Sequence, residues 1–235
     1  MSDRAAPGPD VRRILVVGAG GFGREVVLWA RDAWPTAASM MAGFLAADAV
    51  GTDECPLPIL ASPDDFQPRP DDVLLLAIGI PAVRRRVAES LLARGGRFLT
   101  LIHPTAIVAP SASIGPGSIL CPYAIASDST SLGRFTLLNY HASLGHDAST
   151  GDFSVLSPYA TLGGWAHVGA DVFMGLHASV APGKSVGASS KVSANSACLA
   201  DVPAGSIVFG VPGRAMPRVG VTRDSGHAPG DTVRA

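Results

Sequence analysis

A six-residue rhythm of apolar positions runs through the second half of the chain. In hexads counted from Ile114 to Cys198, twelve of fifteen first positions are large and aliphatic, and eight second positions are glycine. The fifth position is Ser, Ala, Thr or Val in every hexad except that of Lys184. A simple strand would place apolar residues at every second position, and a helix at intervals of three and four. The pattern instead predicts one short strand and one tight turn per hexad, with the first and fifth positions inward and glycine where the backbone needs a positive φ.

Three such hexads close one triangular coil, so the repeat predicts about five coils of a parallel β-helix in which each rung bonds to its neighbours. The alternative is a generic β-rich domain, which an unbroken phase over fifteen hexads disfavours. The expected fold is therefore a β-solenoid that begins near residue 102.

The first hundred residues follow another pattern. Residues 12–32 indicate a strand, the glycine-rich turn GAGGFG and an amphipathic helix; residues 40–46 and 73–80 indicate two further strands, and residues 81–96 a second helix. A glycine-rich turn between a strand and a helix suits a phosphate, because free backbone N–H groups face the anion. NAD is disfavoured, because one βα unit alone carries the motif and no acidic residue lies about 20 positions on. The glycines could also serve only close packing.

The hexads IGPGSI, LGRFTL, LGHDAS and VGADVF and the segment GSIVFGVPGRAMPRV resemble those of the left-handed β-helix acyltransferases. A small Rossmann-like domain joined to such a β-helix by an IHP segment is similar to the sialic-acid O-acetyltransferase family, which includes the bacillosamine and perosamine N-acetyltransferases. The resemblance covers about residues 12–218. It implies a disordered tail (1–11), a Rossmann-like nucleotide-sugar-binding domain (12–101), a β-helix acyltransferase domain (102–213) and a partly disordered extension (214–235).

His146 is the leading catalytic candidate. It occupies the third place of its hexad, a turn position, and Gly164 occupies the same place one coil, about 5 Å, further on. Acyl transfer from a thioester needs a base for the nucleophile and a donor for the oxyanion, which an imidazole and a free amide can provide. The resemblance agrees, since GHD matches the family's catalytic motif; it implies that Asp147 orients the ring and that Asn139 lies near the acceptor.

The resemblance further implies acetyl-CoA as the acyl donor. The Gly164 N–H is the expected hydrogen-bond donor to the thioester carbonyl of acetyl-CoA. Three cations are candidates for binding the phosphates of acetyl-CoA: Lys184, Lys191 and Arg214. The acceptor is expected to be a nucleotide-linked amino sugar on the glycine-rich loop, with these contacts: Gly18, Gly20, Gly21, Phe22, Gly23 and Asp48. The chain departs from the family at three places. Ala46 and Ala47 stand where members often carry a pair of acids, and Val155 stands where they often carry a histidine that helps bind the acyl donor. In the closing motif, Gly213 replaces the usual alanine.

Composition excludes several other partners. A formal net charge of -1, from 18 basic and 19 acidic residues, gives no field for nucleic acid or an anionic membrane. Three scattered cysteines form no disulfide framework or zinc site, and no apolar run could span a bilayer. We therefore expect a cytoplasmic protein without a metal. His141 and His177 lie two coils apart, too far to share a metal, and are assigned to surface or interface packing.

Two further expectations concern assembly and function. The β-helix would expose more aromatic surface than a monomer should have, from Tyr140, Phe153, Tyr159, Trp165 and Phe173. A homotrimer is therefore expected, with its active sites between neighbouring β-helices.

The leading function is N-acetylation of a nucleotide-linked amino sugar by direct attack of its amino group on the thioester. The alternatives are O-acetylation of a sugar or sialic acid hydroxyl, and a non-catalytic β-helix that binds a ligand.

Overall fold

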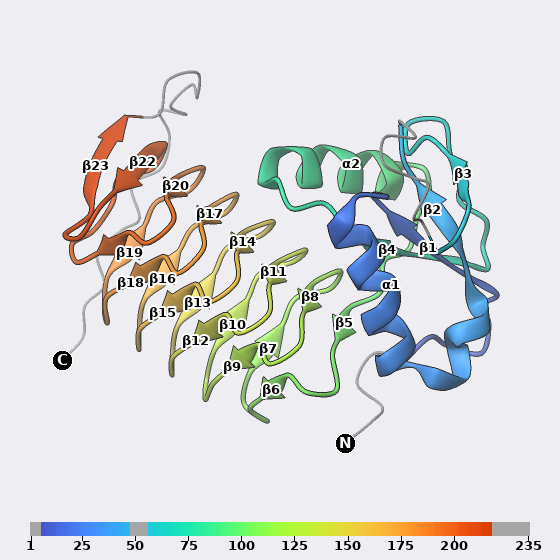
Figure 1. Cartoon of the computed structure of the whole chain (residues 1–235), viewed down its shortest axis with the longest axis horizontal. Coiled ribbons are helices and arrows are strands. Elements are labelled where there is room, and N and C mark those ends of the chain that lie inside the picture. The colour runs from blue at the N-terminus through green and yellow to red at the C-terminus, as the bar shows by residue number, and fades with distance from the viewer. Residues whose placement is uncertain (1–5, 48–55, 218–235) are drawn as a thin grey trace.

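The computed structural model describes residues 6–47 and 56–217, which form an α/β unit followed by a β-solenoid (Figure 1). The α/β unit has a parallel sheet in the order β3-β2-β1-β4. Strands and helices are present at all the positions predicted for residues 12–96, while the short helix η1 and strand β3 were not predicted. The bounds are β1 Arg13–Val17, α1 Gly21–Ala33, η1 Pro35–Met40, β2 Met41–Leu45, β3 Ile59–Ala61, β4 Asp72–Leu76 and α2 Pro81–Ala93.

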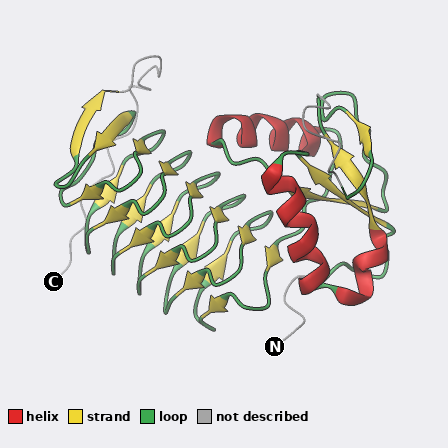
Figure 2. Ribbon diagram, in the orientation of Figure 1, coloured by secondary structure: helices red, strands yellow, loops and turns green. Residues whose placement is uncertain are grey.

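The solenoid has three faces built mainly from two-residue strands, and the helices among the described residues all belong to the α/β unit (Figure 2). Most strands on one face pair in parallel with partners eighteen residues apart, as in Ser131↔Ser149. The first face contains β5 Leu101–Ile102, β8 Ile119–Leu120, β11 Leu137–Leu138, β14 Val155–Leu156, β17 Phe173–Met174, β20 Lys191–Val192, β22 Ser206–Phe209 and the antiparallel β23 Arg214–Pro217. The second contains β6 Ile107–Val108, β9 Ile125–Ala126, β12 Ser143–Leu144, β15 Thr161–Leu162, β18 Ser179–Val180 and β21 Ala197–Cys198. The third contains β7 Ser113–Ile114, β10 Ser131–Leu132, β13 Ser149–Thr150, β16 His167–Val168 and β19 Ser185–Val186.

The predicted inward positions are confirmed. First-place residues such as Leu138 and Leu156 are fully buried, and so are fifth-place residues such as Ala142 and Ala160. Together they form one continuous core through the solenoid. Lys184, the exception at the fifth place, is only partly buried.

The predicted reason for the second-place glycines was wrong. Their φ angles are not positive; instead, a Cβ at Gly115 would lie 2.5 Å from the carbonyl carbon of Gly133 on the next coil, and one at Gly145 would lie 2.8 Å from the Gly164 nitrogen. Close stacking of coils, not backbone conformation, therefore excludes a side chain there. Positive φ occurs at the fourth place, in twelve residues that are not glycine: Tyr123, Ser129, Phe135, His141, Asp147, Phe153, Tyr159, Trp165, Asp171, His177, Ser189 and Asn195.

The α/β unit packs on the outside of the first face, where Ile119, Leu137 and Val155 join its hydrophobic core. Helix α2 lies against the corner between the third and first faces, as Figure 1 shows. There Arg85 forms a double hydrogen bond with Asp171, at 2.9 Å and 2.7 Å, and lies 4.3 Å from the centre of the Phe153 ring.

Because the α/β unit packs on the solenoid, the prediction that five aromatic residues are exposed is wrong for three of them. Phe153 is completely buried beneath α2, and Phe173 and Tyr140 are partly buried against the α/β unit. Of the five predicted aromatic residues, Tyr159 and Trp165 are exposed. The terminal segments also make contacts where they are described: Val11 is buried, and β23 pairs with β22. Within residues 6–47 and 56–217, no helix has the length and apolar character needed to span a membrane.

Candidate active site

His146 and Asp147 lie in the turn between β12 and β13, at the corner that joins the second and third faces. This corner, called the His146 corner below, also carries Gly164 and Trp165 one coil further on. The His146 Nδ1 atom lies 2.9 Å from Asp147 Oδ2, so a proton on Nδ1 is donated to the carboxylate and Nε2 is left as the basic nitrogen. Both side chains are partly exposed, at 51% and 39%, so a substrate can reach them. The predicted pairing of these two residues is present.

The imidazole ring lies directly over Gly164. A Cβ on Gly164 would come within 2.6 Å of both Nε2 and Cε1 of His146, so only glycine leaves room for the ring in this orientation. Among the described residues, no hydrogen-bond acceptor engages the Gly164 N–H. Trp165 packs edge-on to the imidazole at 4.4 Å between ring centres, and its backbone N–H donates to the His146 carbonyl at 2.9 Å. An imidazole, a carboxylate bonded to its Nδ1 and a free backbone amide therefore meet on adjacent coils.

Asn139 is not brought to this corner. It precedes the turn between β11 and β12, at the opposite end of β12 from His146, and its Oδ1 accepts a hydrogen bond of 2.8 Å from the Tyr140 N–H. Within one chain, Asn139 and His146 thus lie on different corners of the solenoid.

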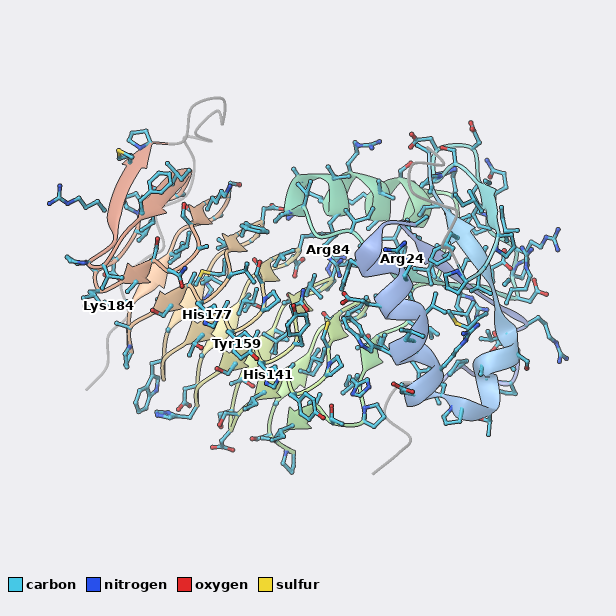
Figure 3. The ribbon with its side chains drawn as sticks, viewed as in Figure 1. Arg24, Arg84, His141, Tyr159, His177 and Lys184 are labelled. Atoms are coloured by element: carbon cyan, nitrogen blue, oxygen red, sulfur yellow. The ribbon has the colours of Figure 1, made fainter. Side chains whose placement is uncertain are left out.

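The three cations predicted for the acyl donor are also spread over the solenoid. Lys184 lies at the His146 corner, one coil beyond Gly164, and is labelled in Figure 3. Lys191 belongs to the first face, with its Nζ 5.8 Å from the centre of the Phe173 ring, and Arg214 is exposed on β23. Of the three, Lys184 shares a corner with His146.

The glycine-rich loop connects β1 to α1 at the carboxyl edge of the sheet. Gly18 has a φ of 109° and Gly23 sits so close to the Gly18 carbonyl that a Cβ would overlap it, so these two glycines are required by packing. Gly20 and Gly21 are different, because a Cβ on either would meet no atom within 4 Å. Phe22 packs edge-on to Trp29, with ring centres 6.0 Å apart. Asp48 lies outside the described residues.

His141 and His177 belong to a column of stacked rings on the corner between the first and second faces. The column consists of Tyr123, His141, Tyr159 and His177, with successive ring centres 5.0, 4.8 and 4.7 Å apart and nearly parallel planes. Figure 3 labels the last three of these residues. The sequence analysis did not predict this stack, although its signal, an aromatic ring at every eighteenth residue, was present. Within the described ranges no three His, Cys, Asp or Glu side chains are grouped so that they could hold a metal.

The other two histidines that the structure describes, His103 and His167, have structural partners. His103 is buried, with Nδ1 2.8 Å from Thr105 Oγ1. His167 on the third face has Nδ1 2.9 Å from Ser149 Oγ, and burial lowers the pKa of its imidazole. The His103 Nε2 atom also lies 3.4 Å from Asp32 Oδ2, a longer contact than the 2.9 Å between His146 and Asp147, and the His103 side chain is almost fully buried.

Comparison with known proteins supports an acyltransferase fold. No family model matches the chain. UDP-N-acetylbacillosamine N-acetyltransferase of Bacillus subtilis (strain 168) is 47% identical over 51 residues, 22% of this chain and 24% of that protein. GDP-perosamine N-acetyltransferase of Escherichia coli O157:H7 is 37% identical over 59 residues, 25% of this chain and 27% of that protein. The matched segments thus span about a quarter of the length of these curated relatives.

A solved structure extends the similarity to most of the chain. The acetyltransferase domain of PglB from Neisseria gonorrhoeae FA1090 has a TM-score of 0.79 and 28% identity, covering 87% of this chain and 100% of that chain. The same domain in complex with acetyl coenzyme A gives a TM-score of 0.78. The resemblance predicted from the hexads is confirmed: the chain resembles the hexapeptide-repeat acyltransferases, with nucleotide-aminosugar N-acetyltransferases among its relatives.

Proposed function

We propose that the protein transfers an acetyl group from acetyl-CoA to the amino group of a nucleotide-linked amino sugar. The observation that carries this proposal is the set Asp147, His146 and Gly164 on adjacent coils. The names of the relatives, a UDP-linked and a GDP-linked amino-sugar N-acetyltransferase, support the acceptor class. The PglB domain that has been solved with acetyl coenzyme A supports the donor.

In the proposed reaction the acceptor amine attacks the thioester carbonyl directly. His146 Nε2 accepts the proton that the nitrogen loses, while Asp147 holds the ring through Nδ1. The Gly164 N–H donates to the oxygen that becomes negative as the tetrahedral intermediate forms. Collapse of this intermediate breaks the C–S bond, and the proton held by His146 can pass to the departing thiolate of CoA.

The α/β unit is proposed to bind the acceptor as a Rossmann-like domain, with the division between residues 12–101 and 102–213 as predicted. Packing explains Gly18 and Gly23 but leaves Gly20 and Gly21 open to solvent at the start of α1. Helix α1 has no side-chain cap and no acidic residue in its first turn, so its free N–H groups and dipole favour an anion such as a diphosphate. The proposed contacts of the acetyl-CoA phosphates are still Lys184, Lys191 and Arg214. We also propose that the β-solenoid coils with a left-handed twist.

The decisive assay measures thiol release from acetyl-CoA with UDP-linked, GDP-linked and free amino sugars as acceptors. Acceptor-dependent release with a nucleotide-linked sugar, and an N-acetyl product by mass spectrometry, is the expected result. Equal rates with free amino sugars would contradict the nucleotide requirement. Release with a hydroxyl acceptor alone would favour O-acetylation.

A homotrimer is the proposed assembly. The separation of Asn139 from His146 on one chain, together with the exposed Tyr159 and Trp165, supports composite sites between copies. Light scattering at micromolar concentration is expected to give three times the mass of the chain. A stable monomer with full acetyl-transfer activity would exclude shared sites.

A further inference from the structure

Arg84 is a fully buried arginine at the junction between the α/β unit and the solenoid (Figure 3). It lies on the inner face of α2 with Val87, Ala88 and Leu91, which are buried apolar residues. The spacing of these residues already placed Arg84 on the apolar side of the helix, a signal that the sequence analysis did not use. Arginine is rarely fully buried unless its charge is compensated.

The guanidinium hydrogen-bonds to backbone carbonyls from both parts of the protein. Its Nη1 donates to Leu76 O at 2.6 Å and to Ile78 O at 2.9 Å, the carbonyls on either side of Ala77. Its Nε donates to Phe135 O on the solenoid at 2.7 Å. One planar group therefore holds the loop after β4 in place and fixes this loop to the coils.

The positive charge of Arg84 has no anionic partner among the described residues. All the acceptors of its hydrogen bonds are carbonyls, and its Nη2 is buried without any acceptor. Burial lowers the pKa of the guanidinium to about 9, so it remains charged at neutral pH. Burial also raises the pKa of the nearby Cys121 thiol, which is therefore neutral there. A buried cation without a counter-charge is costly, and an anion bound close by would relieve that cost.

The loop that Arg84 holds lies beside the glycine-rich loop. β1 and β4 are adjacent parallel strands with Val17 opposite Leu76, so their following loops leave the sheet at the same edge. The loops touch: a Cβ on Gly18 would lie 2.6 Å from Ala77 O. At Gly79, as at Gly20, a Cβ would meet nothing within 4 Å. Both loops thus present an open glycine at the carboxyl edge of a parallel sheet, where such sheets bind ligands.

We propose that Arg84 is a positioning residue of the acceptor site: it holds residues 77–80 as a second wall opposite the glycine-rich loop and provides the buried positive charge that favours a nucleoside diphosphate there. This inference rests on the proposed function for the identity of the acceptor. Arg84 acts through the loop and does not touch the ligand. Its bond to Phe135 O also sets where the acceptor lies relative to the solenoid.

The test measures binding of UDP, GDP and CoA by calorimetry, using the full chain and three variants. Gly79→Val and Gly20→Val add a side chain on each wall in space that is empty in the protein, so both should fold normally. Arg84→Lys keeps the charge but cannot bond to three carbonyls at once. Each variant is expected to weaken the tighter-binding nucleotide about tenfold, which is about 1.4 kcal/mol, and to leave CoA affinity unchanged. Arg86→Gln, which removes an exposed arginine paired with Asp64, is the matched control and should bind like the wild type.

The outcomes separate this inference from the proposed function. If Gly20→Val weakens nucleotide binding and Gly79→Val does not, the second wall is wrong while the glycine-rich loop stands. Wild-type nucleotide affinity in a folded Arg84→Lys protein would overturn the role of Arg84; if that variant does not fold, Gly79→Val decides. Should the wild type bind nucleotide without transferring acetyl, the proposed chemistry fails and the binding series still decides this inference. Binding of neither UDP nor GDP to the wild type would overturn both.

Discussion

Replacement of His146 by alanine is expected to lower kcat by 10² to 10⁴, the usual loss when a general base is removed. The fold should survive, because the His146 side chain is half exposed. Among the described residues, it makes one side-chain hydrogen bond, to Asp147, and one edge-on ring contact, with Trp165. The Km values for donor and acceptor should change little, since the lost interaction is made in the transition state. Steady-state kinetics with both substrates varied, and a melting curve of the variant, measure these effects.

His141→Ala is the matched control, because it also removes an exposed imidazole from a turn of the solenoid, but one that stacks between aromatic rings and is not bonded to a carboxylate among the described residues. It should retain most of the wild-type kcat. Asp147→Asn should cost less than His146→Ala, because the ring loses its orientation and not its basic nitrogen. Near-normal turnover of His146→Ala with saturating acceptor would rule out the mechanism, and His141 would become the next candidate.

Gly164→Ala is expected to lower kcat on the order of 100-fold, as misplacement of a reacting group by about 1 Å can do. The added methyl would lie 2.6 Å from Nε2 and Cε1 of His146, so the ring must move away from its position over the amide. The ring is the mobile end of an exposed side chain, and the melting temperature should therefore stay close to that of the wild type. The backbone N–H itself is retained in the variant.

A double-mutant cycle shows whether Gly164 acts through the ring. If the methyl group only displaces His146, the variant that carries both Gly164→Ala and His146→Ala should be no slower than His146→Ala alone. Additive losses would mean that the substitution also damages the position of the donor amide. Wild-type kcat in Gly164→Ala would show that the ring orientation seen here is not the one used in the reaction.

The α/β unit shows how far local patterns reach. The strand, turn and helix signals of residues 12–32 predicted β1, the loop and α1, but the packing of α2 on the solenoid joins residues far apart in sequence. Arg84 and Phe135 are separated by 51 positions, and Arg85 and Asp171 by 86. No periodicity links such pairs, and for this reason Phe153 was expected at the surface and lies in the interior.

The candidate site divides in the same way. His146, Asp147 and Gly164 could be found from sequence, because adjacent places in one hexad and equal places eighteen residues apart become neighbours in any solenoid of this period. Asn139 and Lys191 could not be placed, since a position within the hexad does not by itself reveal which corner or face shares a ligand with which. The open Gly20 and Gly79 likewise became distinguishable from the packed Gly18 and Gly23 only when neighbouring backbone was in view.

The sequence by itself therefore determined the repeat, the inward residues and the pairing of His146 with Asp147, because each follows from a short period in which every residue's neighbours are a fixed number of positions away. The tertiary structure decided why the second-place glycines are needed, which aromatic residues are buried, and that a buried arginine joins the loop after β4 to the coils. These features depend on distances between backbones and side chains of separate elements. Close packing sets those distances, and no periodic pattern in the chain encodes them.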